Sequence, residues 1–301
     1  MIKIDKRISI LDVPGFRYPH CNCLWIEDDI KCLIDTSPSE NDLAFLKSQK
    51  VDLIINTHSH IDHYLYNNHF PKSKILMHRA DHGVAQSSDK YLEEFGFKAF
   101  GRHPELNAQI LEGISYSTSR IDGEITDKQL INLGATTIET LHLPGHSPGH
   151  CGFIFPQQGF IFTADMDLSK FGPWYGTMSC SLADLFKSID KLLDIKPDYI
   201  ITSHGEAVIK GDVSKRLKEY RDIIYARQRR IVDLIYKGCH SLEEIASEVP
   251  VYVKLPRPTS IFYIYEQVMV LVHLRYLQEQ GHVIEDKQRY YLKAGKHLNM
   301  S

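Results

Sequence analysis

The stretch NTHSHIDHY, residues 56–64, places three histidines and one aspartate within six consecutive positions. It directly follows VDLII, a short apolar run that is typical of a strand buried on both faces of a sheet. Imidazole nitrogens and carboxylate oxygens are ligands that zinc prefers, and His58, His60, Asp62 and His63 are close enough in sequence to face two neighbouring ions. The stretch therefore predicts a metal site at the end of a buried strand.

Three further apolar runs also end in residues that can bind metal. TTIETLHL leads to His146, GFIFTA leads to Asp165, and DYIIT leads to His204. A single histidine is most often a surface residue or a satisfied core residue, so none of these runs would carry the argument alone. Active-site residues of layered α/β folds gather where strands end, because the loops converge there while the sheet stays rigid. The four strand ends together predict one site at one rim of the fold.

The composition is that of an ordinary globular protein. Of the 301 residues, 43% are hydrophobic and 24% are charged, which is enough to bury a sizeable core. The first ten residues lack the apolar centre of a secretory signal, and no run of about 18 apolar residues predicts a membrane span. Six irregularly spaced cysteines are typical of reduced thiols rather than of a disulfide framework. We therefore expect a cytoplasmic protein with no membrane partner.

Net charge and the pattern of predicted elements both change near residue 212. Residues 213–301 contain 15 Lys and Arg against 10 Asp and Glu, a net charge of +5, whereas residues 1–212 carry −8. Short strand patterns punctuated by Gly and Pro come before this point, and long helical patterns come after it. We therefore predict a catalytic domain over residues 1–212, with residues 83–135 as a helical or loop insertion near the pocket, and a helical domain over residues 213–301.

The motifs HSHIDH (58–63), PGHSPGH (144–150), FTAD (162–165) and SHG (203–205) resemble, in this order, the metal motifs of the metallo-β-lactamase superfamily, in its hydrolase branch. The resemblance implies an α/β fold, the αββα sandwich, with the site at one edge. It also implies two ligand sets that share one carboxylate. The first metal would be held by His58, His60 and His146, the second by Asp62, His63 and His204, and Asp165 would bridge them.

This ligand set implies hydrolysis. Two divalent ions about 3.5 to 4 Å apart can share a water and lower its pKa, so that a metal-bridging hydroxide exists near neutral pH. Zinc is favoured, with manganese or iron as alternatives, and Asp62 would orient the hydroxide. Tyr175, in FGPWYG (171–176), could donate to an oxyanion, although a packed loop is the alternative for this segment. Tyr116, Arg102 and His103 are weaker candidates for pocket contacts.

The last part of the chain predicts three helices and a hairpin. The helices fall in the stretches 215–238, 241–249 and 260–281, and the hairpin turns near Asp286 and Lys287. This order is that of a winged helix, and it resembles the small extension of a superfamily subgroup related to β-lactamase-like protein 2, some members of which are endoribonucleases. Residues 261–277 are apolar almost all round, with Arg275 as the only Lys or Arg. Such a helix is buried rather than free to read bases, so we predict packing, pocket-walling or homodimerisation, and nucleic-acid binding is not favoured.

Three functions from different classes remain at this point. The favoured one is a dinuclear hydrolase of a small ester, thioester or lactone. The second is a metal-dependent endoribonuclease or phosphodiesterase, which would need a basic channel leading from the metals. The third is a non-catalytic metal-binding regulator, which would lack an open coordination position for water. The complete donor set, with both Asp62 and Asp165 present, favours an enzyme over a regulator.

Overall fold

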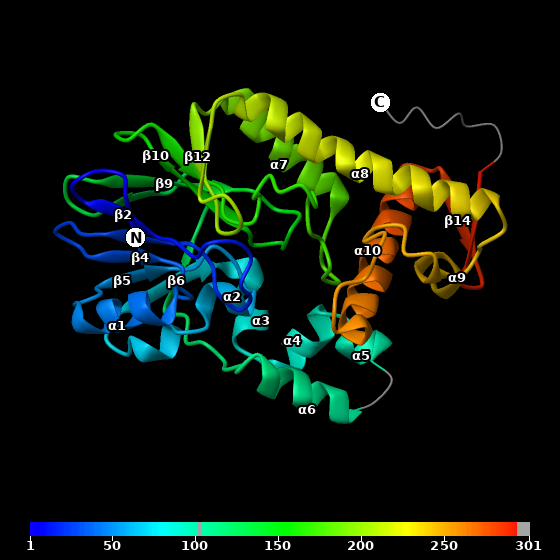
Figure 1. Ribbon diagram of the computed structural model, residues 1–301, viewed down its shortest axis with the longest axis horizontal. Helices are drawn as coiled ribbons and strands as arrows, with labels where there is room; N and C mark the ends of the chain where they lie inside the picture. The colour runs from blue at the N-terminus through cyan, green and yellow to red at the C-terminus, as the bar shows by residue number, and fades with distance from the viewer. Residues whose placement is uncertain (102–103, 294–301) are drawn as a thin grey trace.

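Two β-sheets packed face to face, with helices on both outer faces, form the centre of the molecule (Figure 1). The computed structural model describes residues 1–101 and 104–293. The arrangement is the predicted four-layer α/β fold. Its layers follow from the burial of the strands, because each sheet has one face against the other sheet and one face against helices.

The first sheet contains seven strands that pair in chain order. The pairs from β1 to β4 are antiparallel, and those from β4 to β7 are parallel. The central strands read as uninterrupted apolar runs because both of their faces are covered. The strands are β1 (Ile2–Lys3), β2 (Ile8–Leu11), β3 (Cys23–Ile26), β4 (Cys32–Ile34), β5 (Leu53–Ile55), β6 (Lys74–His78) and β7 (Gly123–Ile125).

The second sheet contains six strands in the order β13-β12-β11-β10-β9-β8. All of its pairs are antiparallel except β11 with β12, where Ile161 lies opposite Ile200. The strands are β8 (Leu130–Asn132), β9 (Thr137–His142), β10 (Cys151–Phe155), β11 (Phe160–Phe162), β12 (Tyr199–Ile201) and β13 (Val208–Lys210). The predicted strands before His58, His146, Asp165 and His204 are thus confirmed as β5, β9, β11 and β12.

Helices cover the outer faces of both sheets. Ser39 caps the first helix by accepting a hydrogen bond from the backbone N–H of Asp42, as its sequence position predicts. Ser181 caps the helix on the second sheet in the same way, and Lys196 ends it in the left-handed conformation just before Pro197. The helices are α1 (Glu40–Ser48), α2 (Ile61–Tyr64), α3 (His82–Ala85), α4 (Ser88–Glu94), α5 (Phe97–Phe100), α6 (Pro104–Gly113), α7 (Leu182–Ile195), α8 (Val213–Tyr236), α9 (Leu242–Ser247) and α10 (Thr259–Glu279), with short 3₁₀ turns at Asn67–His69 and Arg79–Asp81.

Three buried clusters define the layers. Leu43 and Leu46 of α1 pack on the outer face of the first sheet. Leu185 and Ile189 of α7 pack on the outer face of the second sheet. The core between the sheets is formed by side chains from both, among them Ile10, Leu24, Ile34, Ile55, Phe153, Phe162 and Ile201.

Only the first part of the predicted insertion, residues 83–135, lies outside the two sheets. Its first part forms α4, α5 and α6, as a helical insertion would. Its last part supplies β7 to the edge of the first sheet and β8 to the edge of the second. The chain crosses between the sheets over residues 126–129, so this end of the segment is part of the sandwich itself.

The C-terminal part contains three helices and a hairpin in the predicted order. Helix α8 begins directly after Asp212, whose side chain caps it, and the hairpin is formed by β14 (Val283–Asp286) and β15 (Arg289–Leu292). A single hydrophobic cluster extends from the second sheet through α7 and α8 to α10, so these helices share one core with the sandwich (Figure 1). The winged-helix relationship and a domain boundary at residue 212 stay predictions. Within residues 1–101 and 104–293, no helix combines the length and apolar character needed to cross a bilayer.

The core between the sheets gives a direct test of this packing. Phe153 is fully buried there, whereas Leu130 on β8 is 66% exposed. We expect Phe153→Ala to lower the free energy of unfolding by about 3–5 kcal/mol, because the substitution removes buried apolar surface and leaves a cavity. Leu130→Ala, the control, should change it by less than about 0.5 kcal/mol. Denaturant titration followed by circular dichroism measures both, and equal effects would contradict the assigned core.

Candidate metal centre

The loop after β5 is held in place by a buried aspartate on the neighbouring strand end. Asp35 accepts hydrogen bonds from the backbone N–H of Thr57 (2.8 Å) and from its hydroxyl (3.0 Å). The carbonyl of Thr57 in turn accepts from the backbone N–H of Cys151, at the start of β10 in the other sheet (3.0 Å). These bonds fix the stretch 56–60 at the rim where the two sheets meet.

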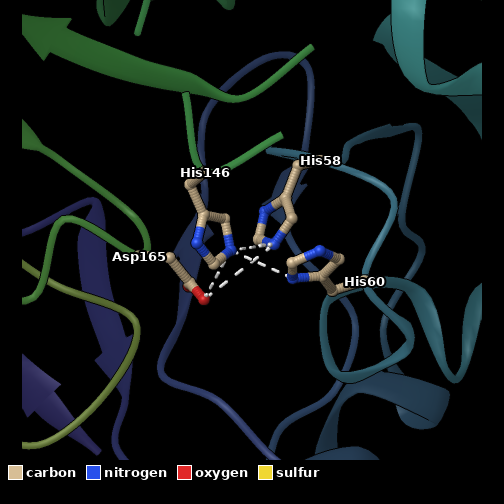
Figure 2. Close-up of side chains that lie close together, drawn as sticks. All are labelled: His58, His60, His146 and Asp165. Atoms are coloured by element: carbon tan, nitrogen blue, oxygen red, sulfur yellow. Dashed lines mark hydrogen bonds and ion pairs between the residues drawn. The ribbon is translucent and has the colours of Figure 1, made fainter. Parts of the chain in front are cut away.

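The structure brings His58, His60, His146 and Asp165 together in a first ligand group (Figure 2). His146 Nε2 lies 3.2 Å from His58 Nε2, 3.0 Å from His60 Nδ1 and 3.2 Å from Asp165 Oδ2. Figure 2 shows all four side chains pointing toward one another, with His58 and His60 on one loop and His146 and Asp165 on two others. The donor atoms, not the ring carbons, face the shared centre.

A second group lies on the other side of Asp165. His63 Nε2 is 3.0 Å from Asp165 Oδ1, and His204 Nε2 is 3.5 Å from the same oxygen. Asp62 Oδ2 is 3.3 Å from His204 Nε2 and 3.9 Å from His63 Nε2. The two oxygens of Asp165 therefore face different groups, Oδ2 the first and Oδ1 the second.

These separations fit metal ions. Four nitrogen or oxygen ligands bound tetrahedrally at 2.0–2.2 Å lie about 3.3–3.6 Å from one another. The donors of each group approach this spacing, and within each group the donor atoms lie within 4.8 Å of one another. His63 Nε2 and Asp165 Oδ1 are buried without a hydrogen-bond partner in the described structure, although buried polar atoms are normally paired. A cation between them would satisfy both atoms.

His58, His63 and His146 face the centre with Nε2, and each has its other ring nitrogen engaged in a hydrogen bond. Nδ1 of His58 donates to the Thr57 hydroxyl (2.9 Å), and Nδ1 of His63 donates to Asp35 Oδ2 (2.8 Å). Nδ1 of His146 donates to the carbonyl of Trp174 (2.8 Å). Such outer partners fix the tautomer that leaves the lone pair of Nε2 free for a metal.

Asp81 ties the first metal loop to the loop of His146. Its carboxylate accepts from the backbone N–H of Ser59 (2.9 Å), the hydroxyl of Ser147 (2.7 Å) and the backbone N–H of Gly149 (2.7 Å). A Cβ atom at Gly149 would lie 2.6 Å from this carboxylate, so only glycine allows the approach. Burial raises the pKa of Asp81, against the effect of these three hydrogen bonds.

His150 supports Asp165 from behind. Its Nδ1 donates to the carbonyl of Leu143 (2.9 Å), and its Nε2 accepts the backbone N–H of Asp165 (3.3 Å). Burial, with the nearby His146, lowers the pKa of His150 to about 3. The imidazole therefore stays neutral near pH 7, as its acceptor role requires.

Burial dominates the electrostatics of the first group. Burial and the neighbouring histidines hold the pKa of both His58 and His60 well below the usual value, although Asp165 acts in the opposite direction. Both rings are therefore neutral and available as ligands at neutral pH.

Carboxylates dominate the second group. Burial opposes the charged form of His63, but Asp165, Asp35 and Asp62 outweigh it and raise the pKa of His63 well above its usual value. The pKa of His204 is raised for the same reason, by Asp165 and Asp62 against burial. The histidines in turn lower the pKa of both Asp62 and Asp165, although burial opposes this. Without a metal, imidazolium protons supply the positive charge that the carboxylates need.

An aromatic wall borders the first group. It consists of Phe95, Trp174 and Tyr265, which come from the end of α4, from the segment after β11 and from α10. The ring of His60 lies 5.1 Å from that of Phe95 and 5.5 Å from that of Trp174, and Trp174 lies 5.4 Å from Tyr265. The C-terminal helix therefore reaches the vicinity of the metal ligands.

The structure does not bring Tyr175 to the ligand groups as an open hydroxyl donor. Its side chain is fully buried, and its hydroxyl is hydrogen-bonded to His273 Nε2 (2.8 Å) and to Arg227 Nη1 (3.1 Å). This placement corrects the predicted oxyanion role and agrees with a packed loop. Tyr116 lies behind the wall, against Tyr91, and the remaining pocket candidates, Arg102 and His103, fall outside the described residues.

The sequence did not identify Asp35, Asp81, His150 or the Trp174 carbonyl as parts of the site. Of these residues, only Asp35, in IDTS, could have been found from the sequence, because it is a polar residue directly after a buried strand, like the candidate ligands. A backbone carbonyl leaves no trace in the sequence at all.

The opposite pKa shifts of the two groups predict a difference in proton release. The raised pKa values of His63 and His204 let these rings keep protons to a higher pH than His58 and His60, whose pKa values are lowered, and a metal must displace those protons. We expect metal binding to the Asp62, His63 and His204 group to release protons, and this group to lose its metal first as the pH falls. Calorimetric titration in buffers of different ionisation enthalpy counts the protons. Equal release for both ions would contradict the assigned charge states.

Comparison with known proteins places these features in a family. The family model described as Metallo-beta-lactamase superfamily matches residues 18–204. The chain is 26% identical over 224 residues to "Hydroxyacylglutathione hydrolase GloC" of Haemophilus influenzae, covering 68% of this chain and 93% of the relative. It is 34% identical over 120 residues to "N-acyl homoserine lactonase" of Bacillus sp., 39% of each chain, so it spans well under half of that relative.

A solved structure extends the likeness to the whole fold. The metallo-beta-lactamase family protein TTHA1429 from Thermus thermophilus superposes with a TM-score of 0.73 at 20% identity, covering 97% of this chain and all of that chain. The family match covers more than half of the chain and includes every residue of both ligand groups. The chain therefore belongs to the metallo-beta-lactamase superfamily and is one of its hydrolases.

Proposed function

We propose that the protein is a dinuclear metal-dependent hydrolase of a small ester, thioester or lactone. The observation that carries the proposal is the position of Asp165, whose Oδ2 faces the first group at 3.2 Å from His146 and whose Oδ1 faces the second at 3.0 Å from His63. A carboxylate shared in this way fits two ions better than one. We propose zinc, because the donors are mostly imidazoles.

Bound as a pair, such ions would polarise the scissile carbonyl and make a water molecule nucleophilic near neutral pH. The side chain of Asp62 is 9% exposed, and its pKa is held low by His63 and His204 against the effect of burial. It would therefore be ionised and able to accept a proton at a carboxylate oxygen. We assign to Asp62 the orientation of the attacking water and the return of the proton to the leaving group. Hydrogen bonds between Nδ1 of His63 and the side chains of Thr57 and Asp35 hold the His63 ring next to Asp62.

The relatives support this substrate class. Their names describe a hydroxyacylglutathione hydrolase and an N-acyl homoserine lactonase, which act on a thioester and a lactone respectively. Neither substrate can be transferred directly, since the identities are 26% and 34%. What the two share is attack on an activated acyl carbon, and this is what we carry over.

The aromatic wall supports an apolar group on the acyl side. Phe95 and Trp174 lie beside His60, and Tyr265 lies beside Trp174. All three belong to, or pack against, one hydrophobic cluster that consists of apolar and aromatic side chains. Such a surface would favour an apolar acyl chain over a charged one.

The endoribonuclease or phosphodiesterase alternative has less support. Ile264, Val268 and Leu274 of α10 are buried, so this helix could not present a polar face to a nucleic-acid groove without leaving its core. A purely regulatory metal site has less support as well. The carboxylates of Asp62 and Asp165 keep partial exposure beside the ligands, as an open coordination position would require.

The central test is a substrate panel with Asp62→Asn. We expect the wild-type protein, purified without chelator, to carry two divalent ions and to hydrolyse thioesters or lactones in preference to phosphodiesters and single-stranded RNA. Asp62→Asn removes the ionised oxygen, so kcat should fall by at least roughly 100-fold. Steady-state kinetics and metal analysis measure both properties.

Asp222→Asn, which changes an exposed carboxylate on α8, is the matched control and should behave as wild type. Absence of two metals that cannot be restored would refute the dinuclear proposal. Activity retained in Asp62→Asn would refute the role of Asp62, and cleavage restricted to RNA would select the second hypothesis.

A second test addresses the acyl side. We expect Tyr265→Ala to lower kcat/KM for substrates with long apolar acyl chains roughly tenfold more than for short ones, because the chain would lose contact with the wall. Tyr276→Ala, on the same helix but packed against Phe186, is the control and should affect both substrates equally. A parallel loss for long and short chains in Tyr265→Ala would mean that the wall is not an acyl site.

A further inference from the structure

The segment Phe171–Tyr175, which follows Asp165 in the chain, connects the metal centre to the C-terminal helices. On one side, the carbonyl of Trp174 accepts the hydrogen bond from Nδ1 of His146 at 2.8 Å. On the other side, side chains of α8 and α10 hold the same segment. A metal ligand and the C-terminal helices therefore meet in five consecutive residues.

Arg227 of α8 makes most of the contacts on the helical side. Its side chain is almost completely buried, and Nη1 donates to the carbonyl of Pro173 at 2.6 Å and to the hydroxyl of Tyr175 at 3.1 Å. Nη2 donates to the carbonyl of Phe171, and the guanidinium lies over the ring of Phe171 at 4.4 Å. The group thus binds the residues before and after Trp174.

Burying a guanidinium is costly, and it is usually compensated by a carboxylate. Among the described residues, no carboxylate lies within ion-pair distance of Arg227, and its hydrogen bonds go to two backbone carbonyls and one hydroxyl. The rigid fork of an arginine fixes the direction of such carbonyls in a way that a lysine cannot. Its contacts therefore determine how the peptide units on both sides of Trp174 are oriented.

Two further contacts complete the anchoring. The indole Nε1 of Trp174 donates to the hydroxyl of Tyr252 at 2.9 Å, and the hydroxyl of Tyr175 pairs with Nε2 of His273 on α10 at 2.8 Å. Hydrogen bonds thus fix the indole ring and the carbonyl of Trp174 as well as the side chain of the next residue, Tyr175. Since the carbonyl selects the Nδ1–H tautomer of His146, this anchoring presents Nε2 to the first ligand group.

We infer that Arg227 is a positioning residue for the metal centre, acting through the Trp174 carbonyl on His146, and that the C-terminal helices serve to hold this ligand. The inference rests on the metal centre of the proposed function. A purely structural Arg227 would support stability and leave the metal affinity unchanged once the protein is folded. The two roles therefore differ in a property that does not depend on turnover.

The experiment titrates Co²⁺ into the metal-free protein, following the visible absorption and competing with a chelator, for wild type, Arg227→Lys and Arg227→Met. The matched control is Arg275→Met, since Arg275 of α10 also donates to a backbone carbonyl, that of Met178, at 2.6 Å, but no metal ligand bonds to that residue's carbonyl. We expect both Arg227 variants to bind the His146 site about 10- to 100-fold more weakly and with an altered cobalt spectrum. Arg275→Met should keep the wild-type affinity and spectrum.

The inference is overturned if folded Arg227 variants bind Co²⁺ like wild type, or if Arg275→Met loses affinity to the same extent. If the Arg227 variants do not fold, Tyr252→Phe carries the test, because it frees the indole of Trp174 while leaving both ligand groups intact. Weaker Co²⁺ binding by Tyr252→Phe supports the inference, and unchanged binding overturns it. Failure of the wild-type protein to bind Co²⁺ would instead refute the metal centre, and with it the proposed function.

Discussion

The structure depends on one carboxylate that is shared between two sets of buried histidines. Asp165 is ionised in a place where burial alone would keep it neutral, because His63, His204 and His146 surround it. Removing it would leave two clusters of imidazoles with no common negative charge. The carboxylate of Asp165, just after β11, therefore has to lie between the two histidine groups. The loops after β5, β9 and β12 have to bring His63, His146 and His204 to it. Because the cluster is buried, each charged carboxylate is stable only beside a positively charged partner, and each imidazolium only beside a carboxylate.

The sandwich supplies the rigidity that such a centre needs. Donors come from loops that belong to both sheets, and two buried aspartates tie those loops together. Asp35 holds the loop of the first sheet, and Asp81 spans from Ser59 to Ser147 and Gly149. These residues bring no donor into either group, yet they determine where the donors lie. The site is thus a property of the interface between the sheets rather than of any single loop.

Much of this could be predicted from the sequence. The strands before His58, His146, Asp165 and His204 were evident because apolar runs ended abruptly in donor residues, and this pattern is local. The placement of Tyr175 was not, because its buried hydroxyl depends on Arg227 and His273, which lie 52 and 98 positions away. The edge strands β7 and β8 were missed as well, since each is partly exposed and lacks the uninterrupted apolar run that marks the equally short β5, β11 and β12. Local patterns therefore identified the donors, whereas long-range packing determined their supports.

The crossing of the chain at residues 126–129 has a consequence for biosynthesis. All strands of the first sheet, together with His58, His60, Asp62 and His63, precede this crossing, whereas His146, Asp165 and His204 follow it. As the polypeptide leaves the ribosome, four of the seven candidate donors emerge with the first sheet of the sandwich, before their counterparts on the second sheet have been translated. Both candidate ligand groups are complete only after residue 204 has emerged and the second sheet has docked. Under the proposed function, metal acquisition would be a late step of maturation, and the early histidines would meet the ions of the surroundings before their partners are in place.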